Sequence, residues 1–238
     1  MITDISIENI TELLVHQLNS WWGDAYSQAI VRDNVAEALE KVEQGYSGLS
    51  AQHFCENGVV KFSPFHSVSW SVFLYRLSRI LFLQENLREA NVVYYLNKIM
   101  HSIDWFYGVD LPVHFMAEHP LGTILGKASY GDYLFVYQGV TVGGNRKDGK
   151  LYYPVLGENV VLYANATLLG DTHIGNNVII SANTYLISEN VPDNCIVFGK
   201  TPNVVIKQKT EKEIYQMTRA FWNWDNRGTT LVSDRASS

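Results

Sequence analysis

His119 is the residue whose type and setting best suit chemistry. It lies in the run Met-Ala-Glu-His-Pro-Leu-Gly, beside the carboxylate of Glu118 and just upstream of a long repetitive stretch. An imidazole has an unperturbed pKa of about 6.5, so it is mostly neutral at physiological pH and can accept a proton as a general base. The run therefore indicates a catalytic base. A histidine with a purely structural role is the alternative.

The stretch downstream of His119 repeats every six residues. Such a period fits neither an α-helix nor an alternating strand, but it is typical of a parallel β-helix, whose short strands stack around a narrow apolar core. A β-sandwich, the alternative, needs longer alternating runs. Residues 145–153 break the period and predict a loop that protrudes from one coil. The repeated apolar positions are Ile124, Tyr130, Val136 and Val142, then Leu156, Leu162, Leu168, Ile174, Ile180 and Leu186.

Composition excludes several classes of protein. A net charge of −6 argues against a general nucleic-acid binder, which needs a basic surface. Cys55 and Cys195 stand far apart and suggest neither a disulfide framework nor a zinc motif. The N-terminal sequence lacks the pattern of a signal peptide, and the apolar segment 72–83 is too short and too charged to span a bilayer. We therefore expect a cytoplasmic protein without a membrane span.

The chain divides into three parts. Residues 1–107 are expected to form an α-helical domain, because their apolar residues recur at three-to-four spacing and predict a helix pair over residues 66–106. Residues 108–207 carry the repeat and are expected to form the β-helix. Residues 208–238 are expected to hold a helix over 209–224 and a polar tail. The predicted fold class is therefore α+β.

Five short motifs accompany this organisation: Leu74-Tyr-Arg76, Gly108-Val-Asp110, Glu118-His-Pro-Leu-Gly122, Val140-Thr-Val-Gly-Gly144 and Gly199-Lys-Thr-Pro202. They resemble motifs of the serine acetyltransferases, a family of hexapeptide-repeat acyltransferases. The family's counterparts include Ala-Tyr-Arg, Asp-His-Ala-Thr-Gly and Val-Thr-Leu-Gly-Gly. This resemblance covers most of the chain. It implies a left-handed parallel β-helix, a handedness that periodicity alone does not reveal.

The resemblance implies O-acetylation by acetyl-CoA, with His119 as the general base that takes the proton of the attacking alcohol. Asp110 matches the family's aspartate that orients the base, and Glu118 matches an aspartate of the same pocket. Backbone N–H groups near Gly143 and Gly144 are expected to stabilise the oxyanion and to let the cofactor approach closely. The family also implies a homotrimer, or a dimer of trimers, with active sites in the grooves between subunits.

Besides Gly143 and Gly144, five residues are expected to contact acetyl-CoA. Ala164 and Ala182 match small residues that line the family's pantetheine groove. Arg146 and Lys147, in the loop, and Lys207, at the close of the β-helix, are candidate partners for the phosphates. Solvated surface cations are the alternative for these three. No metal is expected.

The acceptor site departs from the family. Tyr152 and Tyr153 stand where the family has the arginine and histidine of Asp-Arg-His-Pro, and Glu56 is the nearest candidate for a further substrate-binding aspartate. Because aromatic faces pack against sugar rings, a sugar or surface-polysaccharide hydroxyl is the predicted acceptor and L-serine the alternative. The last residues, Ser237 and Ser238, lack the terminal isoleucine with which many family members dock into cysteine synthase, so no such docking is expected.

Two other classes of function remain as alternatives. Zinc-dependent lyases with a β-helix fold use two histidines five residues apart, a spacing that His114 and His119 share. A third histidine should lie upstream on the β-helix, whereas His101 falls in the helical part and His173 lies downstream. The second alternative is a non-catalytic binding module, against which the retention of His119, Asp110 and Glu118 argues.

Overall fold

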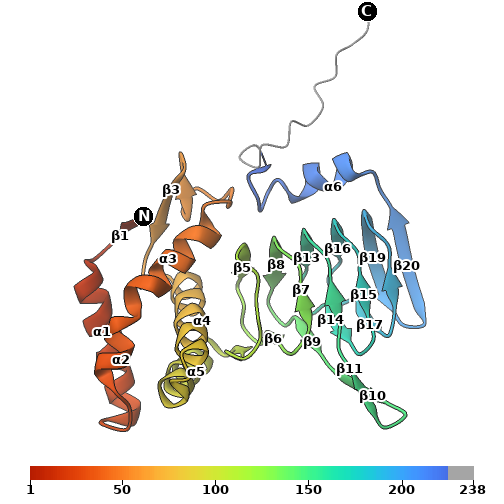
Figure 1. Ribbon diagram of the computed structural model, residues 1–238. Helices are drawn as coiled ribbons and strands as arrows, with labels where there is room; N and C mark the ends of the chain where they lie inside the picture. Colours follow the sequence, from red (N-terminus) through yellow and green to blue (C-terminus); the bar gives the residue numbers. More distant parts are fainter. Residues whose placement is uncertain (225–238) are drawn as a thin grey trace, which may run out of the picture.

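The computed structural model describes residues 1–224 (Figure 1). A helical domain precedes a parallel β-solenoid of about five turns, and a short helix follows it. The predicted succession of a helical domain, a parallel β-helix and a C-terminal helix is thus confirmed. The polar tail predicted over residues 229–238, with Ser237 and Ser238, lies outside the described residues.

The helical domain contains α1 (Ile7–Trp22), α2 (Gln28–Asp33), α3 (Val35–Tyr46), α4 (Ser67–Leu83) and α5 (Leu87–His101). Helix α1 begins where the Ser6 side chain accepts a hydrogen bond from the backbone N–H of Asn9. The central helix α4 packs against α3 and α5 and is buried on nearly every side. In residues 1–224, no helix combines the length and apolarity that a membrane crossing requires.

Residues 46–64 contain part of a small sheet in which β3 (Val59–Phe62) pairs with β1 (Ile2–Thr3) and β2 (Cys55–Glu56).

The solenoid consists of three stacks of parallel strands. The first holds β5 (Phe115–Glu118), β8 (Leu134–Tyr137), β13 (Val160–Leu162), β16 (Val178–Ile180) and β19 (Cys195–Lys200). The second holds β4 (Asp104–Trp105), β6 (Ile124–Leu125), β9 (Thr141–Gly143), β14 (Thr167–Leu169) and β17 (Tyr185–Ile187). The third holds β7 (Ser129–Tyr130), β12 (Val155–Leu156), β15 (His173–Ile174) and β18 (Asn190–Val191). Strand β20 (Asn203–Gln208) pairs antiparallel with β19 at the far end.

The six-residue period locates the core of the solenoid with one exception. Val136, Val142 and all six positions of the second run are buried, and Tyr130 is partly buried. Ile124 was expected inside, but it is 46% exposed and Leu125 is fully buried in its place. The reason is register, because Leu125 pairs with Val142 and the coil between them is one residue shorter than the regular period. The inward position therefore shifts by one at the first coil.

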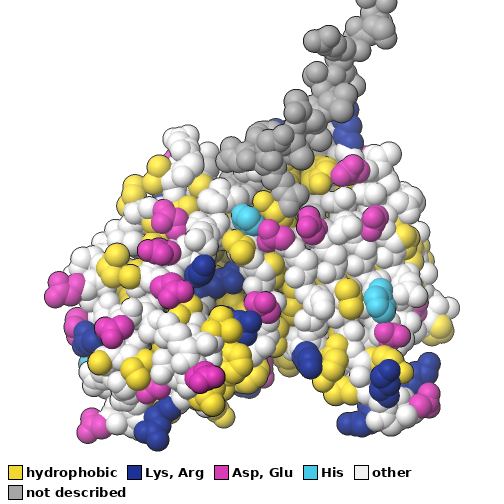
Figure 2. Space-filling view, viewed as in Figure 1, with side chains coloured by type: hydrophobic (Ala, Val, Ile, Leu, Met, Phe, Trp, Pro, Cys, Tyr) yellow, Lys and Arg dark blue, Asp and Glu magenta, His cyan; other side chains and the backbone are white. Residues whose placement is uncertain are grey.

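The predicted loop is a β-hairpin formed by β10 (Asn145–Lys147) and β11 (Lys150–Tyr152). It protrudes from the solenoid after β9, and basic side chains gather on it at the lower right of the space-filling view (Figure 2). Arg146, Lys147 and Lys150 are all exposed there.

Helix α4 holds the segment that leads into the solenoid. The hydroxyl of Tyr75 donates to the carbonyl of Val109 at 2.7 Å and accepts from the N–H of Leu111 at 2.9 Å. The buried guanidinium of Arg76 donates to the carbonyls of residues 111–113. These two side chains of the Leu-Tyr-Arg motif therefore fix the approach to β5, the strand that ends at Glu118.

The C-terminal helix α6 (Glu211–Thr218) begins with a capping box between Thr210 and Glu213, but it ends before the predicted residue 224. The following residues turn back to the helical domain. Ser50 donates its N–H to the carbonyl of Phe221, and Leu49 and Trp222 form a β-bridge. This return segment, residues 219–224, ends the helix early because its backbone bonds to the helical domain instead.

Candidate functional site

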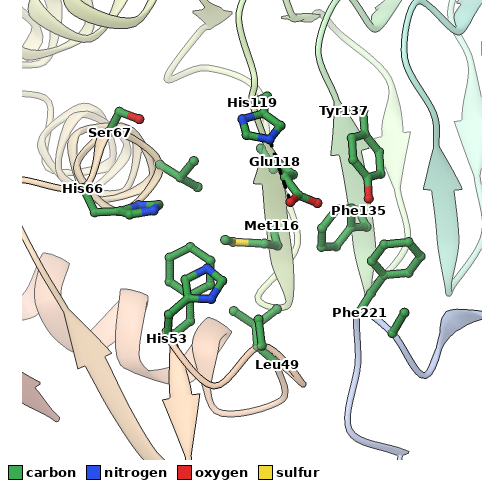
Figure 3. A pocket seen from close by; sticks show the side chains of 15 residues that line it. Leu49, His53, His66, Ser67, Met116, Glu118, His119, Phe135, Tyr137 and Phe221 are labelled. Carbon is green, nitrogen blue, oxygen red and sulfur yellow. Dashed lines mark ion pairs between the residues drawn. The ribbon is translucent and has the colours of Figure 1, made fainter.

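A cavity of about 510 Å³ lies between the helical domain, the first solenoid coils and the return segment (Figure 3). Its volume suits a small-molecule ligand. Polar side chains reach it from two sides: His53, His66 and Ser67 from the helical domain, and Glu118, His119 and Tyr137 from the solenoid. Its apolar lining includes Leu49, Phe54, Val68, Met116, Phe135 and Phe221. The cavity therefore combines an imidazole base with polar partners and an apolar surround.

His119 occupies a strained corner. Its φ of +48° lies in the left-handed region, which non-glycine residues seldom adopt, although Asn, Asp and His do so more often than the rest. Pro120 follows it, and the N–H of Leu121 donates to the carbonyl of His119 at 2.7 Å across that proline. Strain of this kind gathers at functional sites. The turn leaves the imidazole 77% exposed at the cavity, where a ligand can reach it.

Glu118 and Tyr137 end two adjacent strands, β5 and β8, as register partners. The hydroxyl of Tyr137 hydrogen-bonds to the carboxylate of Glu118. Burial first, and then this neighbouring carboxylate, raises the pKa of Tyr137, so its hydroxyl stays a donor at physiological pH. The Glu118 Oε1 atom lies 4.0 Å from Nε2 of His119. Glu118 is therefore held beside the base.

His53 and His66 were not identified from the sequence. Their ring centroids lie 5.8 Å apart, and the ring of Phe54 contacts both. Burial first, and then the nearby His53 and His119, lowers the pKa of His66. His66 is the first residue of the predicted helix pair, but no sequence spacing links it to His119.

Two predicted acidic site residues lie elsewhere. Asp110 is exposed and pairs with Arg79 at 3.4 Å, so its observed partner is a cation of α4. Glu56 pairs with Lys61 at 2.5 Å and lines a separate cleft. Of the three predicted acidic site residues, the structure therefore brings only Glu118 to the cavity.

Ala164 and Ala182 share one corner of the solenoid with His119. His119 directly follows β5. Ala164 occupies the equivalent position on a later coil, because it follows Leu162 of β13, and β13 pairs in register through β8 with β5. The N–H of Asn183, the residue after Ala182, donates to the carbonyl of Ala164, which carries the alignment to the next coil. The predicted small-residue column thus leads away from His119 along the solenoid axis.

The remaining predicted residues lie away from this cavity. Gly143 ends β9, and Gly144 packs against Tyr153, whose Cε1 atom would lie only 2.8 Å from a Cβ at position 144. Tyr153 contacts Lys127, and Tyr152 contacts Lys150, each through an ammonium about 5.0 Å from the ring centroid. None of the residues Gly143, Gly144, Arg146, Lys147, Tyr152, Tyr153 and Lys207 lines the cavity.

The histidine pair of the lyase alternative is not assembled. His114, near the start of β5, hydrogen-bonds to Asp132 at 2.8 Å and stacks on Tyr133 with centroids 4.2 Å apart. His119 follows the other end of that strand. Within residues 1–224, no group of three or more His, Cys, Asp or Glu side chains is placed to hold a metal ion.

Comparisons with known proteins agree with this architecture. Residues 153–188 match the family described as bacterial transferase hexapeptide (six repeats). A serine acetyltransferase of Synechococcus elongatus is 31% identical over 134 residues, which are 56% of this chain and 54% of that protein. The match thus spans about half the length of that relative. A serine acetyltransferase of Staphylococcus aureus is 28% identical over 75% of this chain and 78% of that protein.

Solved structures share the fold at low sequence identity. Serine acetyltransferase from Neisseria gonorrhoeae superposes with a TM-score of 0.65 at 19% identity, covering 89% of this chain and 83% of that one. The enzyme from Vibrio cholerae gives a TM-score of 0.66 at 19% identity, covering 87% and 82%. Together with the repeat and the helical domain before it, these similarities support a serine acetyltransferase-like hexapeptide-repeat acyltransferase.

Proposed function

We propose that this protein is an acetyl-CoA-dependent O-acetyltransferase whose acceptor is L-serine. The observation that carries the proposal is the cavity that both His119 and Glu118 line. The cavity lies at the same corner of the solenoid as Ala164 and Ala182, which occupy later coils. Relatives of this fold have been solved in complex with CoA and with serine, which supports both substrates.

In the proposed reaction, the acceptor hydroxyl lies against the imidazole of His119. The imidazole takes the hydroxyl proton while the oxygen attacks the thioester carbonyl, forming a tetrahedral intermediate. The carbon–sulfur bond then breaks, and the departing CoA thiolate receives the proton from the imidazolium of His119. The carboxylate of Glu118, 4.0 Å from the ring, favours the imidazolium while it exists and attracts the ammonium of an amino-acid acceptor.

The sugar acceptor expected from Tyr152 and Tyr153 is not supported. The relatives carry the name serine acetyltransferase, and neither tyrosine lines the cavity. The two rings pack beside the hairpin instead, against Gly144, Lys127 and Lys150. We therefore place L-serine first.

We propose further that the site is completed in a homotrimer. The column of His119, Ala164 and Ala182 lies at the corner before the β9 stack, whereas the Gly144 hairpin lies at the corner after it. In one subunit these corners are separated by a face of the solenoid. A neighbouring copy that packs along the solenoid can place its hairpin cations opposite the column, where a CoA phosphate would meet them.

The test is an acceptor screen with acetyl-CoA, in which the release of free CoA thiol is followed. L-serine, nucleotide sugars and capsule oligosaccharides are compared on the purified protein, with His119→Ala as the inactive control. The proposal expects the highest kcat/KM with L-serine. If no acceptor causes thiol release, the proposed acetyl transfer is contradicted. A higher kcat/KM for a sugar than for L-serine would contradict only the assignment of L-serine as the acceptor.

A further inference from the structure

The wall of the cavity that the helical domain supplies carries two histidines that the transfer step does not use. His53 precedes β2, and His66 immediately precedes α4. Both line the cavity that also holds Glu118 and His119 (Figure 3). The side chain of His66 makes no capping hydrogen bond to α4, so its ring is not committed to the helix end.

In the described part of the chain, the cavity lacks a lysine or arginine that could pair with the carboxylate of an amino-acid acceptor. Among the described residues that line it, Glu118 is the carboxylate and neither lysine nor arginine occurs. An amino-acid acceptor brings its own carboxylate, which is costly to bury without a cationic or hydrogen-bonding partner. His119 must stay unprotonated to serve as the base. Positive charge for the acceptor carboxylate can therefore come from His53 and His66.

We propose that His53 and His66 form the subsite for the carboxylate of the amino-acid acceptor, an inference that rests on the proposed function. The acceptor ammonium then lies against Glu118, and its hydroxyl lies against His119. The helical domain would thus supply the cationic groups that the resembling family has as arginine and histidine at the positions of Tyr152 and Tyr153. The pair determines specificity and takes no part in proton transfer.

Local electrostatics support this role. The titratable groups around His66 are His53 beside it and Glu118 and His119 across the cavity. Burial and the two neighbouring histidines lower the pKa of His66, so its ring is neutral while the cavity is empty. A bound carboxylate reverses this balance and favours the imidazolium. Ser67 and Val68 begin α4 on the same wall, where the positive end of the helix dipole adds to the attraction.

The first experiment compares L-serine with L-serinamide, which keeps the hydroxyl and amine but lacks the carboxylate. Wild type is measured beside His53→Gln, His66→Gln and the double variant, with His173→Gln, an exposed histidine of β15, as the matched control. We expect the double variant to raise the KM for L-serine about tenfold or more. The KM for acetyl-CoA and the kcat/KM for L-serinamide should stay near wild type. An equal loss for both acceptors, or an unchanged KM for L-serine, would overturn the proposal.

A second readout detects the proton directly. Calorimetric titration of L-serine at pH 8 in two buffers of different ionisation enthalpy reports how many protons binding takes up. Wild type should take up protons with L-serine and not with L-serinamide, and the double variant should lose the uptake. Binding of L-serine without proton uptake, or no binding of L-serine to wild type, would overturn the subsite. Histidine-dependent binding without turnover would uphold the subsite while contradicting the proposed transferase.

Discussion

The hydroxyl of Tyr137 hydrogen-bonds to the carboxylate of Glu118 across two neighbouring coils of the solenoid. This contact fixes the carboxylate that stands beside His119. The ring of Tyr137 is itself held by Tyr163 of the next coil, with centroids 5.1 Å apart and planes only 7° from parallel. The stacking of successive coils therefore helps to orient Glu118.

Replacing Tyr137 by phenylalanine removes this hydrogen bond and keeps the stacked ring. Glu118 then loses its tether, so we expect the KM for the acceptor to rise about three- to tenfold, as for one hydrogen bond to a charged group. Steady-state kinetics with L-serine and acetyl-CoA varied separately provide the measurement. Tyr163→Phe is the matched control. A rise in the KM for acetyl-CoA alone would contradict this role.

His119→Ala should lower kcat by about two to four orders of magnitude, the usual contribution of a positioned general base. Because the ring is largely exposed, its loss removes little packing, and the thermal midpoint should stay near wild type. Thiol release and calorimetric unfolding measure the two effects, with His173→Ala as the control. Retention of wild-type kcat would remove His119 from the mechanism.

Glu118 and Asp110 make different predictions when each is replaced by its amide. Glu118 lies 4.0 Å from His119, whereas Asp110 pairs with Arg79, so Glu118→Gln should lower kcat/KM more than Asp110→Asn. Parallel kinetics over a range of pH would compare them. A larger loss for Asp110→Asn would instead support the orienting role that resemblance assigns to Asp110.

Arg76→Met should lower the free energy of unfolding by about 3 kcal/mol, because the carbonyls of residues 111–113 lose their buried charged donor. Urea unfolding followed by tryptophan fluorescence measures the change. The control is Arg32→Met, which removes an exposed ion pair with Glu12 and should leave stability nearly unchanged. Similar destabilisation by both variants would contradict the specific role of Arg76.

His101 predicts how stability depends on pH. Burial, opposed in part by its hydrogen bond to Asn97, lowers the pKa of His101 to about 4. The unfolded chain binds this proton near pH 6.5, so stability is fully present above that pH and declines as pH falls toward 4. The loss across this window is about 3 kcal/mol. Urea unfolding at several pH values should show a smaller slope in His101→Gln than in wild type, and an identical slope would contradict the assignment.

The repeat made the solenoid predictable because each coil places the same position inward. The exception at Ile124 has the same cause, since the coil that ends at Val142 is one residue short and a fixed period cannot detect a local deletion. The end of α6 was mispredicted because the bonds that replace further helical turns involve Ser50, far away in the sequence.

The site was only partly predictable. Glu118 and His119 are adjacent in sequence, and their motif identified them. The opposite wall comes from His53, His66 and Phe221, whose proximity depends on how the helical domain and the return segment meet the solenoid. No periodicity or local motif in the sequence predicts these contacts between the helical domain, the return segment and the solenoid. For the same reason, Tyr152 and Tyr153 could be assigned to a loop but not to a corner of the solenoid.

The return segment also sets when the cavity is assembled during synthesis. Phe221 is a lining residue, and its carbonyl is bonded to Ser50, which is made much earlier. A nascent chain on the ribosome that has not reached Phe221 already contains His119, Glu118 and every lining residue of the helical domain, yet its cavity lacks one wall. A complete cavity therefore requires Phe221 and its bond to Ser50, so a nascent chain gains this wall only after Phe221 has joined the helical domain.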